Sequence, residues 1–126
     1  MGREVLGVVR TEPGDPFVRV YAHCAREAAP GSVAFLAINL HRDRDASFAF
    51  PRGAGRDVEI YQVTAASLDA REVRLNGEPM KASGAPLVFT PRRALFEGTI
   101  TLPPLSYSFF VVKAGVRGCV PPPLPL

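Results

Sequence analysis

The segment Leu105–Lys113 constrains the fold of this chain more than any other. It is short and rich in aromatic and β-branched residues, which favours a strand over a helix. Side chains of an extended strand alternate between two faces, which gives two sets: Leu105, Tyr107, Phe109 and Val111 on one face, and Ser106, Ser108, Phe110 and Val112 on the other. The second half of the segment is therefore apolar on both faces. That pattern predicts a strand inside a sheet, covered above and below.

Short apolar or alternating runs recur along the rest of the chain. The thirteen prolines and eleven glycines fall between these runs, as in a sheet protein with many turns. Asn76-Gly77 is the strongest local signal, because this pair supplies the two positive φ angles of a type I′ turn between paired strands. At 126 residues the chain is long enough for one domain with a core of its own. We predict an all-β fold, an antiparallel β-sandwich of about 7–9 short strands, in residues 1–120.

The chain ends in a proline-rich tail, residues 121–126. Its sequence, Pro-Pro-Pro-Leu-Pro-Leu, lacks the backbone donors of a sheet strand and favours an extended polyproline conformation. The spacing Pro122-x-x-Pro125 is one that SH3 domains read. Such matches are common by chance, so we predict a frayed terminus rather than a ligand.

Charge and hydropathy exclude several classes of protein. The net charge is +3, and the arginine pairs are spread over loops. We therefore expect solvated loop charge and no nucleic-acid partner. No apolar run approaches the roughly 20 residues that span a bilayer. The apolar run near Met1 is too short for a signal peptide, so a secreted form would carry its signal on a longer precursor.

The residues of this chain do not form a recognisable catalytic or metal-binding motif. His23 and His41 are too few for the usual zinc sets, and we expect both at a surface or an interface. No nucleophile elbow, phosphate-binding loop or dinucleotide fingerprint occurs. The twelve acidic residues are scattered, and none is marked as an acid beside a nucleophile. We therefore predict no cofactor, no metal and no active site within this chain.

Two cysteines, Cys24 and Cys119, lie near opposite ends of the domain. Each follows an apolar strand, so a disulfide would tie the first and last strands together. In a cytosolic protein, two cysteines so far apart would more often be unrelated thiols. The residues alone leave both alternatives open.

Four segments resemble the C-terminal β domain of heparanases, in glycoside hydrolase family 79. They are, in chain order, Val18-Arg-Val-Tyr-Ala-His-Cys24, Leu36-Ala-Ile-Asn-Leu-His41, Val73-Arg-Leu-Asn-Gly77 and Leu105-Ser-Tyr-Ser-Phe-Phe-Val111. The last is the most specific, because this string followed by a cysteine near the chain end is unusual. The resemblance runs from about Glu4 to Val120, so only the proline-rich tail falls outside it.

The resemblance has several implications. It implies a disulfide between Cys24 and Cys119, and a domain that packs on a (β/α)₈ barrel which cleaves heparan sulfate as a retaining endo-β-glucuronidase. The two catalytic glutamates of such enzymes lie on barrel strands and have no counterpart here. The chain alone is then not an enzyme, and it meets heparan sulfate only indirectly. The resemblance also implies secretion, to an extracellular or lysosomal location, as part of a longer precursor.

Docking on a barrel would leave an apolar face on the isolated domain. We expect that face to include Phe110 or Val112, with residues such as Phe35 or Tyr61, and the isolated domain to self-associate. The alternative is that both faces of the last strand are buried within a sandwich that stands alone.

Two rival functions remain at this stage. One is a free-standing interaction module that binds sulfated glycans through Arg92, Arg93 and nearby arginines. The other is a cytosolic β protein with free thiols, which follows if the reading frame is complete. A large exposed apolar patch would favour the barrel-docking domain, and a contiguous arginine surface would favour the glycan binder.

Overall fold

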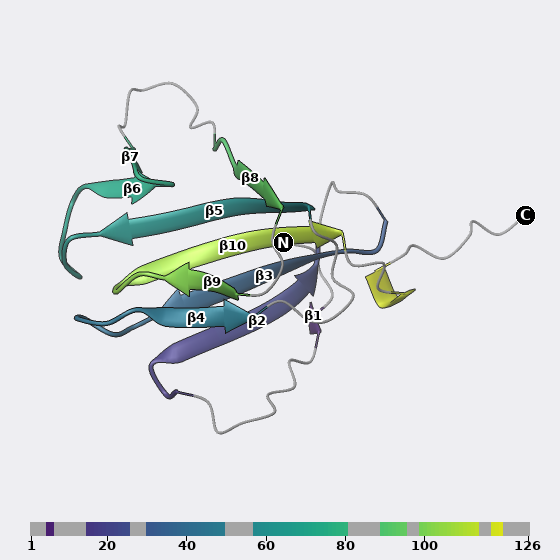
Figure 1. Cartoon of the computed structure of the whole chain (residues 1–126), viewed down its shortest axis with the longest axis horizontal. Coiled ribbons are helices and arrows are strands. Elements are labelled where there is room, and N and C mark those ends of the chain that lie inside the picture. Colours follow the sequence, from purple (N-terminus) through teal and green to yellow (C-terminus); the bar gives the residue numbers. More distant parts are fainter. Residues whose placement is uncertain are drawn as a thin grey trace, which may run out of the picture.

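The computed structural model describes residues 5–6, 15–25, 30–49, 57–80, 89–95, 99–113 and 117–119 (Figure 1). Within these ranges the chain forms strands and one short 3₁₀ turn, which confirms the all-β prediction. The elements are β1 Val5–Leu6, β2 Val18–Cys24, β3 Ser32–Asn39, β4 Ala46–Ala49, β5 Asp57–Ala65, β6 Val73–Leu75, β7 Glu78–Pro79, β8 Arg92–Leu95, β9 Thr99–Leu102, β10 Ser106–Lys113 and η1 Arg117–Cys119. The predicted proline-rich tail lies outside the described residues.

The strands form two antiparallel sheets. The main sheet has the order β1-β2-β3-β10-β5-β6-β7, and β8 pairs with β5 beside β6. The second sheet consists of β4 and β9. β10 lies between β3 and β5, and its Phe110 is in register with Phe35 on one side and Ile60 on the other. The sequence prediction that this segment is an interior strand of a sheet is confirmed.

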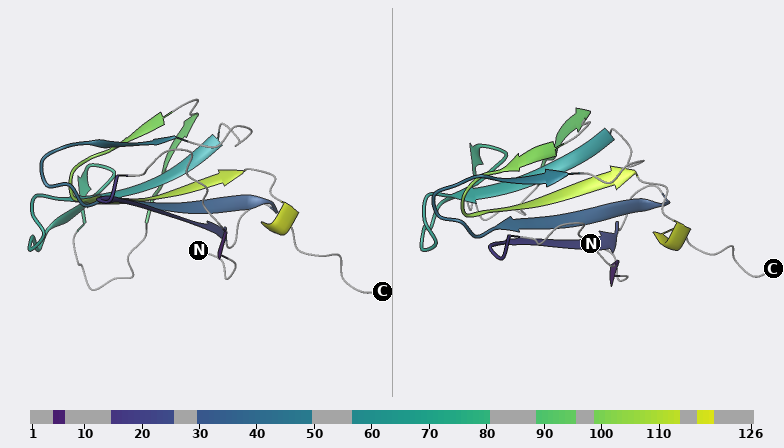
Figure 2. Two further views of the ribbon diagram at one scale, coloured as in Figure 1. Left: turned by 90° about the horizontal axis from the view of Figure 1, so that it is seen from below. Right: turned by 60° about the horizontal axis from the view of Figure 1, so that its bottom comes forward.

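The small sheet covers one face of the main sheet, which we call the inner face (Figure 2). Phe48 of β4 stacks on Phe110 at 5.4 Å between ring centroids and tilts against Phe35, also at 5.4 Å. Ile100 and Leu102 of β9 belong to the same buried cluster. Burial of each such side chain stabilises the fold by roughly 1.5–3 kcal/mol. The core of the sandwich lies between these two layers.

This arrangement corrects the predicted docking face. Phe110 and Val112 are completely buried, and Phe35 is 8% exposed. They lie on the inner face because β4 and β9 pack there and supply apolar partners. Of the four residues named for docking, Tyr61 lies on the opposite face, in register with Phe109.

A disulfide joins Cys24 at the end of β2 to Cys119 in η1, as the resemblance implied. The two Cα atoms are 5.1 Å apart, and the residues are separated by 95 positions. Nearby, the Gly31 amide donates a hydrogen bond to the Cys119 carbonyl at 3.2 Å. The bond closes a loop of nearly the whole domain, which on the chain-entropy model is worth about 4–5 kcal/mol.

The predicted turn at Asn76-Gly77 is also present. Asn76 has a φ of 50° and Gly77 a φ of 85°, and the turn joins the short strands β6 and β7. Positive φ is accessible to glycine and, less readily, to asparagine. The local sequence therefore accounts for this turn.

Candidate docking face

The face of the main sheet opposite β4 and β9, which we call the outer face, carries a continuous apolar surface. One row of register partners crosses four strands, from Tyr21 on β2 through Leu36 and Phe109 to Tyr61 on β5. Partners in register point to the same face of a sheet. With strands about 4.8 Å apart, the row extends roughly 14 Å.

A second row lies beside the first. Tyr107 of β10 is in register with Ile38 and Val63, and Val63 is in register with Leu75 of β6. The rings of Tyr107 and Phe109 meet edge to face at 6.2 Å, which connects the two rows. Aromatic rings in this arrangement stabilise each other beyond their simple burial.

The outer face is only partly shielded. Tyr21 is 48% exposed and Tyr107 43% exposed, whereas Leu36, Ile38 and Phe109 are half-buried by their neighbours. In the described part of the chain, the second sheet and its buried cluster lie on the other side. Monomeric proteins seldom expose an apolar patch larger than a few hundred Å² unless something binds there.

Charged groups surround this apolar surface. Arg19 is in register with Ile38 at one margin, and Glu59 is in register with Val111 at another. Arg93 of β8 pairs with Glu59 at 3.2 Å. Burial raises the pKa of the neighbouring Tyr61 hydroxyl, and the Glu59 carboxylate raises it further. An apolar aromatic centre with a charged rim is the usual composition of a protein interface.

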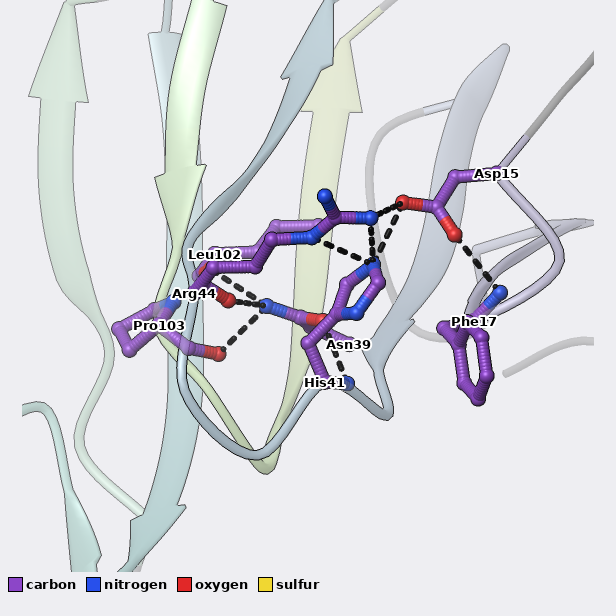
Figure 3. A network of polar contacts seen from close by, with 7 residues as sticks. All are labelled: Asp15, Phe17, Asn39, His41, Arg44, Leu102 and Pro103. Atoms are coloured by element: carbon purple, nitrogen blue, oxygen red, sulfur yellow. Dashed lines mark hydrogen bonds and ion pairs between the residues drawn. The ribbon is translucent and has the colours of Figure 1, made fainter.

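A polar clamp closes one end of the sandwich (Figure 3). Asp15 accepts hydrogen bonds from the Phe17 amide at 2.9 Å and from Arg44 at 3.3 Å, and its other contact is the His41 imidazole. These bonds, chiefly the one to His41, lower the pKa of the Asp15 carboxyl. His41 is 9% exposed, so it lies within the fold and not at the predicted surface or interface. The clamp joins the segment before β2 to the turn after β3.

Asn39 connects this clamp to the second sheet. Its side-chain amide donates to the carbonyls of Leu102 at 2.9 Å, Pro103 at 3.1 Å and Arg44 at 3.1 Å, and its Oδ1 accepts from the His41 backbone amide at 3.0 Å. Asn39 is 1% exposed. Sequence reasoning missed this role. The available signal was one amide at the end of an otherwise apolar strand.

Beside the clamp, residues of three loops line an open pocket of about 500 Å³. Its lining residues are Arg42, Ala66, Ser67, Leu68, Asp69 and Leu105. The Ser67 hydroxyl donates to Asp69 at 2.8 Å. The Arg42 guanidinium makes no ion pair or hydrogen bond with the residues that the structure describes. The cavity is therefore lined by an arginine that has no partner among the described residues and by the apolar side chains of Leu68 and Leu105.

The structure does not join Arg92 and Arg93 into one surface. They are consecutive in β8, in register with Ile60 and Glu59 respectively, and side chains of consecutive strand residues point to opposite faces. Arg93 is engaged with Glu59. The predicted glycan contact is thus divided between two faces of the sheet.

The described ranges contain no group of three or more histidine, cysteine, aspartate or glutamate side chains placed to hold a metal ion. No helix in the same ranges is long and apolar enough to cross a membrane. His41 contacts Asp15 and Arg44, and its described side-chain contacts include no serine, threonine or cysteine nucleophile.

The fold and the outer face define a class of protein: an antiparallel β-sandwich domain with an exposed surface of the interface type. No protein-family model matches the chain. It is, however, 32% identical over 107 residues to inactive heparanase-2 of human and of mouse, a match that covers 76% of this chain. The similarity supports a relationship to the heparanase family. The match spans 18% of the length of each of these relatives.

Proposed function

We propose that this chain is the non-catalytic C-terminal β-sandwich domain of a heparanase-like protein, and that its outer face docks on a (β/α)₈ barrel. The observation that carries this proposal is the outer face itself. Aromatic and aliphatic side chains line up across four strands there, while β4 and β9 bury the inner face. The similarity to inactive heparanase-2 supports it, because those relatives are several times longer than the matched region.

Burial of the outer face would supply the energy for docking. Tyr21 and Tyr107 still have nearly half of their surface exposed, and Leu36, Ile38 and Phe109 add partly exposed area around them. At roughly 25 cal/mol per Å² of apolar surface removed from water, these side chains would serve as the central anchors. The rim charges Arg19, Glu59 and Arg93 would orient the partner more than strengthen binding.

The non-catalytic assignment rests on the family resemblance. Enzymes of glycoside hydrolase family 79 carry their acid and nucleophile glutamates on the barrel, and no segment of this chain resembles those motifs. We expect purified chain to leave heparan sulfate intact. Turnover that is abolished by changing one of its own carboxylates would contradict the assignment.

The same proposal includes a location. A disulfide between Cys24 and Cys119 is the kind of bond that persists in oxidising compartments. We propose secretion as part of a longer precursor, to the extracellular matrix or the lysosome. Immunolocalisation of the native protein tests this, and a cytosolic signal with reduced thiols would contradict it.

A chimaera tests the docking proposal. Human inactive heparanase-2, with its matched segment replaced by this chain, should be secreted as a folded monomer. Tyr107→Asp or Phe109→Asp in the chimaera should reduce secretion strongly, because each places a charge in the docked interface. Ser47→Asp, at an exposed position of β4, is the matched control and should have no effect. Equal secretion of all four proteins would contradict docking through the outer face.

One observation favours a second candidate function, contact with acidic or sulfated glycans. The cavity beside the clamp holds Arg42 without a partner among the described residues, and arginine pairs well with carboxylate and sulfate groups. Heparin oligosaccharide binding should then weaken in Arg42→Gln. The double variant Arg92→Gln with Arg93→Gln serves as the control. If only the double variant lost binding, the glycan contact would lie on β8 and not in the cavity.

A further inference from the structure

Asn76 completes an interrupted edge of the main sheet. Beyond β10, the edge of β5 is shared by two short strands: β8 pairs with residues 57–60, and β6 pairs with residues 63–65. Neither strand is in register with Tyr61 or Gln62. Backbone donors and acceptors left without partners inside a sheet are costly, so this gap requires another occupant.

The side chain of Asn76 acts as that occupant. Its backbone amide donates to the Gln62 carbonyl at 2.8 Å, and its Oδ1 accepts from the Gln62 amide at 3.0 Å. Its Nδ2 donates to the Ile60 carbonyl at 2.9 Å and to the Thr90 carbonyl at 3.4 Å. One residue therefore ties β5 to the β6–β7 turn and to the segment that leads into β8. We call these four hydrogen bonds the Asn76 latch.

The residue after Asn76 is glycine, which makes the latch chemically vulnerable. A peptide nitrogen attacks the preceding asparagine side chain most readily when the following residue has no side chain to obstruct it. Gly77 is exposed, and a Cβ at this position would meet no heavy atom within 4 Å apart from those of its two chain neighbours. Gly77 has no side chain, and no described residue packs over it, so nothing there hinders attack of its backbone nitrogen on the Asn76 side chain.

We propose that Asn76-Gly77 is a deamidation site, and that its modification irreversibly releases the β6, β7 and β8 edge from β5. In the reaction, the Gly77 nitrogen loses its proton to solvent base and forms a bond to Cγ of Asn76. The bond from Cγ to Nδ2 breaks, and Nδ2 leaves as ammonia. Water then opens the cyclic imide, which yields aspartate or isoaspartate. No oxidant, reductant or enzyme is needed.

The latch controls the rate of this reaction in the folded protein. Three of its hydrogen bonds hold the Asn76 side-chain amide against β5 and Thr90, away from the backbone of its own turn. The attack therefore requires the turn to open first, and the rate is reduced by the fraction of molecules that are open. Deamidation at this site reports local opening of the sheet edge.

The product cannot rebuild the latch. In aspartate an oxygen replaces Nδ2, so two donated hydrogen bonds are lost and a carboxylate faces the carbonyls of Ile60 and Thr90. An isoaspartate also lengthens the backbone of a turn that requires positive φ at both central residues. Either product leaves part of the β5 edge without partners, and open edges pair with other chains.

Mass spectrometry of the purified chain, aged at mildly alkaline pH, tests the proposal. The peptide that contains Asn76 should gain one dalton, at a rate about tenfold or more slower in the folded chain than in concentrated urea. Asn39, which is followed by Leu40, is the internal control and should stay unmodified. Gly77→Ala should slow the reaction in urea, where the strain of positive φ is irrelevant.

Hydrogen exchange tests the structural consequence separately. Asn76→Asp reproduces one product, and the Gln62 amide should exchange at least about tenfold faster in this variant than in the wild type. The Phe110 amide, in the centre of the sheet, should keep its protection. Equal modification rates in the folded and urea-denatured chains would overturn the claim that the latch controls the reaction. Unchanged Gln62 protection in Asn76→Asp would overturn the claim of edge release.

Discussion

The two faces of the main sheet have similar compositions and different surroundings. Phe109 and Phe110 are adjacent in β10, yet Phe110 is completely buried under Phe48, whereas Phe109 is half-buried on the open side. Tyr107 on the outer face remains 43% exposed. An apolar strand face acquires its role from the layer that packs on it. The inner face is covered by β4 and β9, whereas in the described part of the chain no second layer packs on the outer face, where we propose that a partner docks.

Replacement of Phe110 should have the largest effect. Phe110→Ala removes a fully buried ring and leaves a cavity between the two sheets, so the free energy of unfolding should fall by about 3–5 kcal/mol. Phe109→Ala, one position away, should cost far less in the isolated chain. Denaturant melts of the two variants compare the faces directly, and equal losses would contradict the distinction between them.

Loss of the Asn39 amide should have the next largest effect. Asn39→Ala removes the bonds to the Leu102, Pro103 and Arg44 carbonyls and leaves buried acceptors without a donor. We expect a loss of about 1–3 kcal/mol in the free energy of unfolding. Gln62→Ala, whose side chain donates to Thr101 in an exposed setting, is the matched control. Equal stability of the Asn39 variant and the wild type would show that the layers do not depend on this amide.

Polar replacement on the outer face should change association more than stability. Tyr107→Ser should alter the free energy of unfolding by about 1 kcal/mol or less, because this residue is already 43% exposed in the isolated chain. It should reduce the self-association that we expect of the isolated wild-type chain. Sedimentation velocity measures this. A monodisperse wild-type monomer would contradict the account of an uncovered docking face.

Acid should weaken the polar clamp by a small amount. The pKa of Asp15 lies below its ordinary value of 3.8, chiefly because of the hydrogen bond with His41. A carboxyl with a lowered pKa in the folded state stabilises the fold above its unfolded pKa, and this contribution is lost as the pH falls through the folded pKa. Asp15→Asn should therefore flatten the acid limb of the stability profile below about pH 4. If the stability of both proteins fell identically at low pH, Asp15 would not contribute to the acid sensitivity of the fold.

Much of the fold is predictable from the sequence, because alternation and turn residues act locally. The interior position of β10 and the turn at Asn76-Gly77 follow from their own residues. The disulfide is predicted only through the family resemblance, since spacing alone leaves the two thiols unassigned. The sequence does not predict which face of β10 packs against the second sheet. The second half of β10 is apolar on both faces, and Ser106 and Ser108, whose hydroxyls would suggest a solvent-exposed face, are buried.

The remaining errors have the same physical origin. The sequence predicts His41 at a surface or an interface because a lone histidine carries no local sign of its partners, and Asp15 and Arg44 reach it only through the fold. Arg92 and Arg93 read as a pair in sequence, but strand geometry separates neighbouring side chains. Burial and side-chain partners depend on which distant segments pack together, so they can be assigned only from the structure.

The most direct test of the docking claim compares thiol reactivity on the two exterior surfaces of the chimaera. Tyr107→Cys places a thiol on the outer face, and Ser47→Cys places one on an exposed position of β4. Both should react with an alkylating reagent in the isolated chain. In the secreted chimaera, position 107 should be protected while position 47 still reacts, as measured on the corresponding peptides. Equal labelling at both positions in a folded chimaera would contradict a docked outer face.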